Sequence, residues 1–233
     1  ALSRRIRWLL LKPSHRRAMP VIRLSRPDPA FDDLFRIYTQ AHPASERKSL
    51  EALRDMISRP EYLFLAAVDP DTVIGFAIAI AFADSDAALL EYVAVDAAHR
   101  GRGIGQLLFR AVADHPQIRD RFLLVEVDSD RMPSPDASDP ARRKRFYSRQ
   151  GCKQIEGLAY QMPRVSTAEP PLMDLLVHRH ELPHAIQKSH LRSWLEACYM
   201  QVYQQSIPDP RIASMLESLP DRIALSEPAG NQM

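Results

Sequence analysis

The 233-residue sequence has little cysteine and no long apolar run, and each scarcity excludes a class of protein. Two cysteines, Cys152 and Cys198, build neither a disulfide framework nor a zinc site. No apolar run approaches the ~20 residues that span a bilayer. The early run Trp8-Leu9-Leu10-Leu11 is also too short for a signal peptide. With 45% hydrophobic and 26% charged residues, we expect a globular, cytoplasmic protein without a membrane partner.

Charge is unevenly distributed along the chain. Residues 1–26 contain eight Arg or Lys and no Asp or Glu. The chain has 31 basic and 29 acidic side chains, so residues 27–233 contain 23 basic and 29 acidic ones and carry a net negative charge. The basic arm, residues 1–18, is of a kind that contacts nucleic acid or anionic lipid, but we favour a solvated terminus. We divide the chain into this arm, a main domain over 19–178 and a C-terminal helical extension and tail over 179–233.

Periodicity and turn signals predict a mixed α/β order. Asp28, followed by Pro29, is an N-cap signal for a helix that ends at His42-Pro43. Short turns between three strand-like runs indicate antiparallel neighbours, and Gly151 is expected to end a helix that begins at Asp139-Pro140. The expected strands are 21–24, 61–69, 73–83, 87–96, 122–127, 152–162 and 172–178; the expected helices include 189–204 and 209–218, with the last dozen residues frayed.

Glycine is also scarce, and three of the seven glycines lie at positions 101, 103 and 105. They fall between a strand and a helix, where backbone N–H groups and the helix N-terminus form an anion site. Arg100 and Arg102 add cationic groups suited to phosphate oxygens, so a pyrophosphate is the expected ligand. A dinucleotide fold is a rival, because Glu126 lies 21 residues past Gly105, but the spacing is GxGxG rather than GxGxxG and the preceding strands are antiparallel.

The stretch LLEYVAVDAAHRGRGIGQLL resembles the signature of the Gcn5-related N-acetyltransferases (GNAT), with Arg100, Gly103 and Gly105 at the motif positions. RFYSRQG, residues 145–151, is similar to the second landmark of that family. The resemblance covers residues 20–178 and implies a mostly antiparallel seven-stranded sheet with a splayed central parallel pair and helices on both faces. It also implies a transferase that uses acetyl-CoA or another short acyl-CoA as co-substrate.

The same resemblance assigns roles to individual residues. Backbone groups of the segment Val93-Ala94-Val95 would pair with the pantetheine amides, and the Val93 N–H would stabilise the oxyanion. The N–H groups of Arg100-Gly101-Arg102-Gly103-Ile104-Gly105 would hold the pyrophosphate. Tyr147 would act as the acid that protonates the leaving thiolate.

Transfer to an amine requires a base, because the ammonium must lose a proton before it attacks. Glu126 is the first choice, because the resemblance extends to family members that modify protein N-termini and use a glutamate at the matching place as base. Glu91 is the second choice, and strand alternation places it on the face of Val93 and Val95. Each is a carboxylate among apolar neighbours, where the pKa is raised. An arginine partner would make either one structural. Acidic residues are expected at the mouth of the site and favour a cationic amine: Asp84, Asp86, Glu126, Asp128 and Asp130.

Other readings remain open. The run Arg142-Arg143-Lys144-Arg145 is either a contact for the 3′-phosphate or a solvated helix face. Helix 189–204 packs on the body or on a second subunit, which makes a homodimer possible. The histidines at 178, 180, 184 and 190 lack a carboxylate motif, so no metal is expected. The alternative function is a non-catalytic acyl-CoA-binding or regulatory module whose basic arm contacts nucleic acid. If the protein is an enzyme, we do not expect nucleic acid as a partner.

Overall fold

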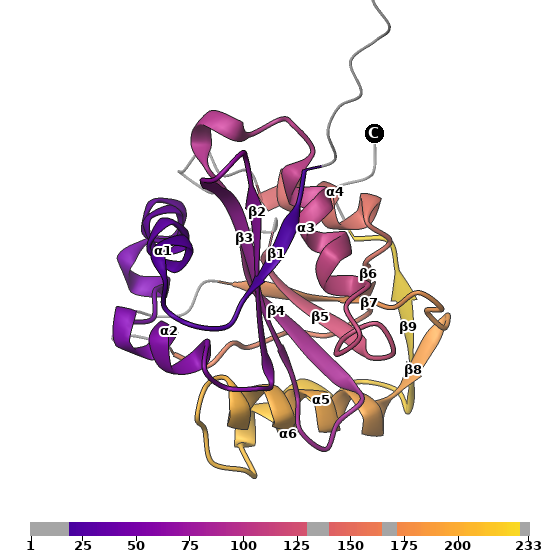
Figure 1. Ribbon diagram of the computed structural model, residues 1–233. Helices are drawn as coiled ribbons and strands as arrows, with labels where there is room; N and C mark the ends of the chain where they lie inside the picture. The colour runs from indigo at the N-terminus through magenta and orange to yellow at the C-terminus, as the bar shows by residue number, and fades with distance from the viewer. Residues whose placement is uncertain (1–18, 130–139, 165–171, 229–233) are drawn as a thin grey trace, which may run out of the picture.

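The computed structural model describes residues 19–129, 140–164 and 172–228 (Figure 1). The basic arm (1–18), the expected mouth residue Asp130 and the expected helix start at Asp139 lie outside the described residues. Nine strands form one sheet in the order β1-β2-β3-β4-β5-β7-β6-β9-β8, which confirms a mixed, mostly antiparallel sheet but has two strands more than the seven expected. The strands are β1 Val21–Leu24, β2 Tyr62–Val68, β3 Val73–Ala81, β4 Ala87–Val95, β5 Phe122–Asp128, β6 Lys153–Ile155, β7 Met173–His178, β8 Ala185–Gln187 and β9 Arg222–Ser226.

Helices cover both faces of the sheet (Figure 1). One face packs against the first two and the last two α-helices, and the opposite face packs against the third and fourth. No helix among the described residues is long and apolar enough to cross a membrane. The helices are α1 Pro29–Ala41, η1 Ala44–Glu46, α2 Leu50–Met56, η2 Ala97–His99, α3 Ile104–Ala113, α4 Pro140–Arg149, α5 Lys188–Gln201 and α6 Pro210–Glu217.

Local signals in the sequence set several of these boundaries. The Asp28 side chain accepts a hydrogen bond from the Phe31 N–H at 3.2 Å, and α1 ends with His42 as its C-cap, as predicted. Gly151, after α4, has φ +84°, the left-handed conformation expected of a residue that ends a helix. The three predicted antiparallel strands are β2, β3 and β4, each within two residues of its expected limits.

The central parallel pair separates like a fork. β4 and β5 are paired from Ala87 and Phe122 as far as Leu90 and Val125, and Glu91 and Glu126 are the next residues on the two strands. β4 also carries a bulge: Tyr92 pairs with Ile78 of β3 and Leu90 pairs with Ala79, so Glu91 is the extra residue. Because a bulge bends its strand, it accounts for the divergence of β4 from β5.

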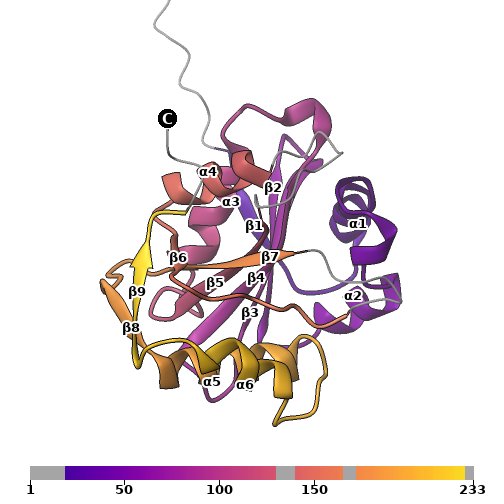
Figure 2. The same ribbon diagram turned by 180° about the vertical axis from the view of Figure 1, so that it is seen from behind.

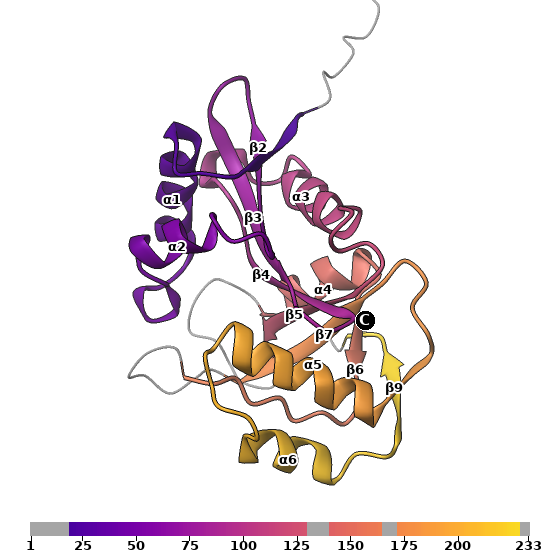
Figure 3. The same ribbon diagram turned by 60° about the horizontal axis from the view of Figure 1, so that its bottom comes forward.

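The C-terminal part of the chain belongs to the same sheet and core. β9 pairs with β6 and β8, so the expectation that the last dozen residues are frayed is wrong for Arg222–Ser226. α5 lies across the starts of β4 and β5 (Figures 2 and 3), where the Trp194 Nε1–H donates to Asp86 at 2.7 Å and the Trp194 ring packs on Phe122. The division into three regions stays a prediction.

One predicted strand is much shorter than expected. The run 152–162 forms a strand only over Lys153–Ile155. Gly157 has φ +73°, a left-handed conformation that interrupts an extended strand. The residues that follow lead to Tyr160, whose side chain is buried in the core.

Candidate active site

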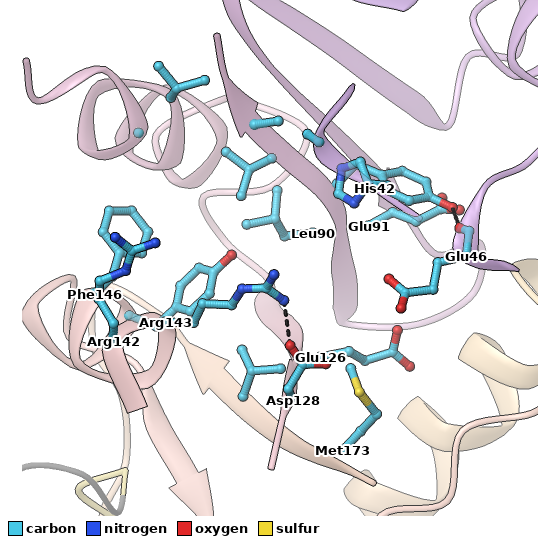
Figure 4. Close-up of a pocket in the computed structure, with 18 of the residues that line it drawn as sticks. His42, Glu46, Leu90, Glu91, Glu126, Asp128, Arg142, Arg143, Phe146 and Met173 are labelled. Atoms are coloured by element: carbon cyan, nitrogen blue, oxygen red, sulfur yellow. Dashed lines mark hydrogen bonds and ion pairs between the residues drawn. The ribbon is translucent and has the colours of Figure 1, made fainter. Parts of the chain in front are cut away.

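A cavity of about 750 Å³ opens where β4 and β5 separate. Figure 4 shows the residues around it: His42 and Glu46 on one side, α4 with Arg142 and Phe146 on the other, and Glu126 between them. Val93, Ala94 and Val95 of β4 also line it. The cavity therefore lies beside the part of β4 that β5 no longer pairs, as the expected thioester site requires.

The glycine loop lies at one end of this cavity. Gly101 and Gly103 have φ of +78° and +82°, and a Cβ at either position would meet no atom within 4 Å, so conformation rather than space requires glycine there. Gly103 is the N-cap of α3 and offers no side chain to its first turn. The first N–H groups of a helix lack intrahelical acceptors, so the loop has the geometry of an anion site; its occupation by pyrophosphate stays a prediction.

The other predicted loop residues occupy different surroundings. Arg100 lines the cavity, and its Nε donates to the Val95 carbonyl at 3.4 Å. Arg102 instead pairs with Asp69 at 3.0 Å. Ile104 is buried against the sheet. Gly105 lines the cavity, and a Cβ added to it would lie 3.6 Å from the Phe146 ring.

Glu126 faces the cavity and is otherwise enclosed by protein. Tyr203 Oη donates to its Oε2 at 2.6 Å, and Tyr160 Oη donates to its Oε1. Burial raises the pKa of Glu126 above the ordinary carboxyl value, while the two tyrosine hydrogen bonds lower it and the charge of Glu91 raises it. Among the described residues, no arginine contributes to the pKa of Glu126, so the arginine partner that would make it structural is not found there.

Glu91 has a different environment. Lys48 Nζ lies 2.5 Å from its Oε1, and the Glu91 side chain is only 6% exposed. The expectation that Glu91 shares a face with Val93 and Val95 is wrong, because it is the bulge residue and the alternation restarts after it. The two valines pack with the α3 side, and Glu91 points to Lys48, just before α2.

Tyr147 lines the cavity and is 8% exposed. Burial raises the pKa of its phenol, so it remains protonated at neutral pH. Of the basic run on the same helix, Arg143 pairs with Asp128 of β5 at 2.5 Å, and Lys144 is buried against Asp174 of β7 at 2.6 Å. The run is therefore not a solvated face at Lys144, whereas Arg142 and Arg145 line the cavity.

His42 and Glu46 line the cavity but are not among the site residues that the sequence predicts, and the same holds for Lys48 and Tyr203. His42 was read only as a helix end, yet its ring packs between Tyr38 and Tyr92, and its buried Nε2 has no hydrogen-bond partner among the described residues. Burial, with Arg143 and Arg47 nearby, lowers its pKa to about 4. Burial and Asp128 raise the pKa of Glu46. Neither His42 nor Glu46 lies in a motif that identifies it.

The expected acidic mouth is only partly correct. Asp84 and Asp86 lie in the turn between β3 and β4, at the opposite end of β4 from the cavity, and Asp86 bonds to Trp194. Glu126 and Asp128 do line the cavity, together with Glu46 and Glu91. Carboxylates therefore gather at the site: two lie on β5 as expected, and two, Glu46 and Glu91, are outside the expected set of mouth residues.

A splayed parallel pair, a glycine-rich turn into α3 and a cavity between them define the class of acyl-CoA-dependent transferases. A family model described as the acetyltransferase (GNAT) family matches residues 31–151. The chain belongs to this family and is an acyl-CoA-dependent N-acetyltransferase. A comparison with curated protein sequences finds no match.

Solved structures with the same fold share little sequence with this chain. A GNAT-family protein from Bacteroides thetaiotaomicron is 22% identical, with 76% of this chain and 93% of that chain covered and a TM-score of 0.60. An aminoglycoside 6′-N-acetyltransferase from Enterococcus faecium is 20% identical over 71% and 99%, with a TM-score of 0.52. Another aminoglycoside 6′-N-acetyltransferase, complexed with coenzyme A, is 21% identical over 71% and 99%, with a TM-score of 0.53. At these identities the comparison establishes the fold.

Proposed function

We propose that this protein transfers an acetyl or other short acyl group from acyl-CoA to a primary amine by direct attack, with Glu126 as the general base. The carrying observation is the position of Glu126. It is the first residue of β5 beyond the paired part of the fork, it faces the cavity, and it is held by two hydroxyl donors. A carboxylate with a raised pKa is a stronger base than an exposed one and suits proton transfer near neutral pH.

The other titratable groups of the cavity fit this role less well. Glu91 already has a counter-ion in Lys48. His42, with a pKa of about 4, is neutral at pH 7 but binds a proton too weakly to take one from an ammonium efficiently. Glu126 is therefore our choice between the two carboxylates, and Glu91 is the second choice.

The reaction then proceeds in three steps. Glu126 accepts a proton from the ammonium, and the free amine attacks the thioester carbonyl. A backbone N–H of β4 beyond Leu90, which we assign to Val93, stabilises the oxyanion. The carbon–sulfur bond breaks, and Tyr147 donates a proton to the thiolate. The second proton released by the amide nitrogen restores the Tyr147 hydroxyl, and Glu126 then gives up its proton to water. The N–H groups of residues 100–105, with Arg100, hold the pyrophosphate throughout.

The acceptor half of the cavity favours a cationic amine. Four carboxylates, those of Glu46, Glu91, Glu126 and Asp128, line the cavity. Its cations are Lys48, which pairs with Glu91, Arg100 beside the glycine loop, and four arginines of α4, of which Arg143 pairs with Asp128. The names of structural neighbours agree with an amine acceptor: two are named for acetylation of aminoglycosides and one, from Escherichia coli, for the alanine of a ribosomal protein. We propose an amine with further positive charge; a homodimer stays a prediction.

The test is thiol release from acetyl-CoA with a panel of amines that differ in charge. We expect turnover with cationic amines, a higher kcat/KM than with neutral ones, and a loss of about 10²–10⁴-fold in Glu126→Gln. Equal activity of Glu126→Gln and the wild type would exclude Glu126 as base. Acetyl-CoA binding by calorimetry without turnover for any amine would instead favour a non-catalytic binding module.

A further inference from the structure

Two tyrosines hold the Glu126 carboxylate, one on each oxygen. Tyr203, just after α5, donates to Oε2 at 2.6 Å, and Tyr160, between β6 and β7, donates to Oε1. They are 77 and 34 residues away from Glu126 in the sequence. Both lie outside residues 31–151, the part of the chain that the family model matches. The pair is therefore supplied by a segment that the family signature does not describe.

The tyrosines are themselves fixed in place. Tyr160 is 3% exposed in the core, and Tyr203 forms part of the cavity wall. The Tyr199 hydroxyl, on the preceding turn of α5, donates to the backbone carbonyl of Gln161. This bond ties α5 to the segment that carries Tyr160, so the two hydroxyl groups reach Glu126 from elements that are joined to each other.

The electrostatic effects on Glu126 oppose one another. Burial removes water from the carboxylate and raises its pKa, and hydrogen bonds to the charged form lower it. Burial, followed by the charge of Glu126, raises the pKa of Tyr160 and Tyr203, which keeps both hydroxyls protonated and able to donate. The titratable groups facing the carboxylate from the elements packed against it are Tyr160, Tyr203, Cys198, Glu91, Lys48, Tyr92 and Tyr199.

We infer that Tyr160 and Tyr203 are positioning residues of the catalytic base, which orient the Glu126 carboxylate toward the cavity and stabilise its charged form. The inference rests on the proposed function, because it takes Glu126 to be the base. It makes the segment around α5 a part of the active site: without the hydroxyl of Tyr203, the base loses one of the two donors that hold its charge.

The experiment is the pH profile of kcat/KM for acetyl transfer to an amine substrate, measured for the wild type, Tyr160→Phe, Tyr203→Phe and the double variant. The profile rises with pH as the base deprotonates. Removal of a hydroxyl donor destabilises the charged carboxylate, so the rising limb moves to higher pH, by about one unit for each tyrosine. At a pH on the rising limb, activity falls by about 10-fold for each tyrosine and recovers at higher pH.

Tyr199→Phe is the matched control. It removes a hydroxyl from α5, the helix that Tyr203 follows, and breaks a hydrogen bond, but that bond goes to the Gln161 carbonyl rather than to Glu126. We expect its rising limb to coincide with that of the wild type. A purely structural role of Tyr160 and Tyr203 would lower kcat/KM equally at all pH values and leave the limb in place, which would overturn the inference.

The Glu126→Gln variant separates the two possible failures. If Glu126→Gln keeps the wild-type activity and rising limb, the proposed base is wrong. If it abolishes the limb while the phenylalanine variants leave the limb unmoved, only the role of the tyrosines is wrong. Thermal unfolding and acetyl-CoA binding of each variant establish that the protein compared is folded.

Discussion

Lys144 of α4 and Asp174 of β7 form an ion pair with Nζ 2.6 Å from Oδ2, and the two side chains are 1% and 3% exposed. Tyr147 follows Lys144 by one helical turn on the same face of α4. The pair therefore fixes α4 on the sheet at the place where the proposed acid enters the cavity. Removal of one partner leaves the charge of the other buried without its counter-ion.

The first prediction concerns this ion pair. Lys144→Met should lower the free energy of unfolding by about 3–5 kcal/mol, because the Asp174 carboxylate stays buried after its counter-ion is removed. Lys144→Met combined with Asp174→Leu should recover most of that loss, since neither charge is then buried. Urea denaturation at pH 7 measures both. A double variant no more stable than Lys144→Met would contradict this account.

The second prediction concerns Lys48 and Glu91. Lys48→Met removes the cation that lowers the pKa of Glu91, so burial raises that pKa further above the unfolded value. The folded protein then binds a proton that the unfolded chain releases, and stability falls as pH rises above about 4.3. The loss relative to the wild type should be larger at pH 7 than at pH 4. Urea denaturation at both pH values tests this, and Lys48→Met combined with Glu91→Gln should abolish the pH dependence of the loss.

The third prediction separates two glycines of the loop. Gly103→Ala forces φ near +82° on a residue with a Cβ and should cost about 1–2 kcal/mol of stability as well as acetyl-CoA affinity. Gly105→Ala has ordinary helical backbone and room beside Phe146, so it should keep or raise stability by up to about 1 kcal/mol. Its methyl group lies at the cavity wall and should weaken acetyl-CoA binding.

Thermal unfolding and calorimetry with acetyl-CoA measure the two effects separately. Full acetyl-CoA affinity in both glycine variants would place the cofactor elsewhere.

The fourth prediction concerns the acid. Tyr147→Phe should lower kcat by about 10²-fold, because the thiolate must then leave unprotonated. The dissociation constant of acetyl-CoA should change little, since the aromatic ring remains in the wall. Steady-state thiol release and calorimetry give the two values. A kcat equal to that of the wild type would make Tyr147 a purely structural aromatic residue.

Local chemistry explains what the sequence predicts well. The N-cap Asp28, the terminating Gly151 and the glycines 101 and 103 act within a few residues, so their signals are readable without the fold. β9 is different: it is a short strand whose stability comes from β6 and β8, elements distant in the sequence. Its pattern alone does not distinguish it from a frayed terminus.

The site residues show the same division. Glu126 was found as a carboxylate in an apolar strand, but its partner Tyr203 lies 77 residues away, and no sequence spacing links them. The error about Asp84 and Asp86 has a geometric cause. They are adjacent to β4 in sequence, but at ~3.3 Å per residue the nine-residue strand carries them to the end remote from the cavity.

The bulge at Glu91 has a consequence for how the enzyme tolerates change. Val93 and Leu90 lie on one face and Tyr92 and Leu89 on the other, so excision of Glu91 would leave every neighbouring side chain on its present side. A shortened strand would gain continuous pairing with β3 while losing its bend. Continuous strand pairing, which would stabilise the sheet, and an open cavity between β4 and β5 therefore exclude each other at this position, and the inserted residue Glu91 favours the cavity.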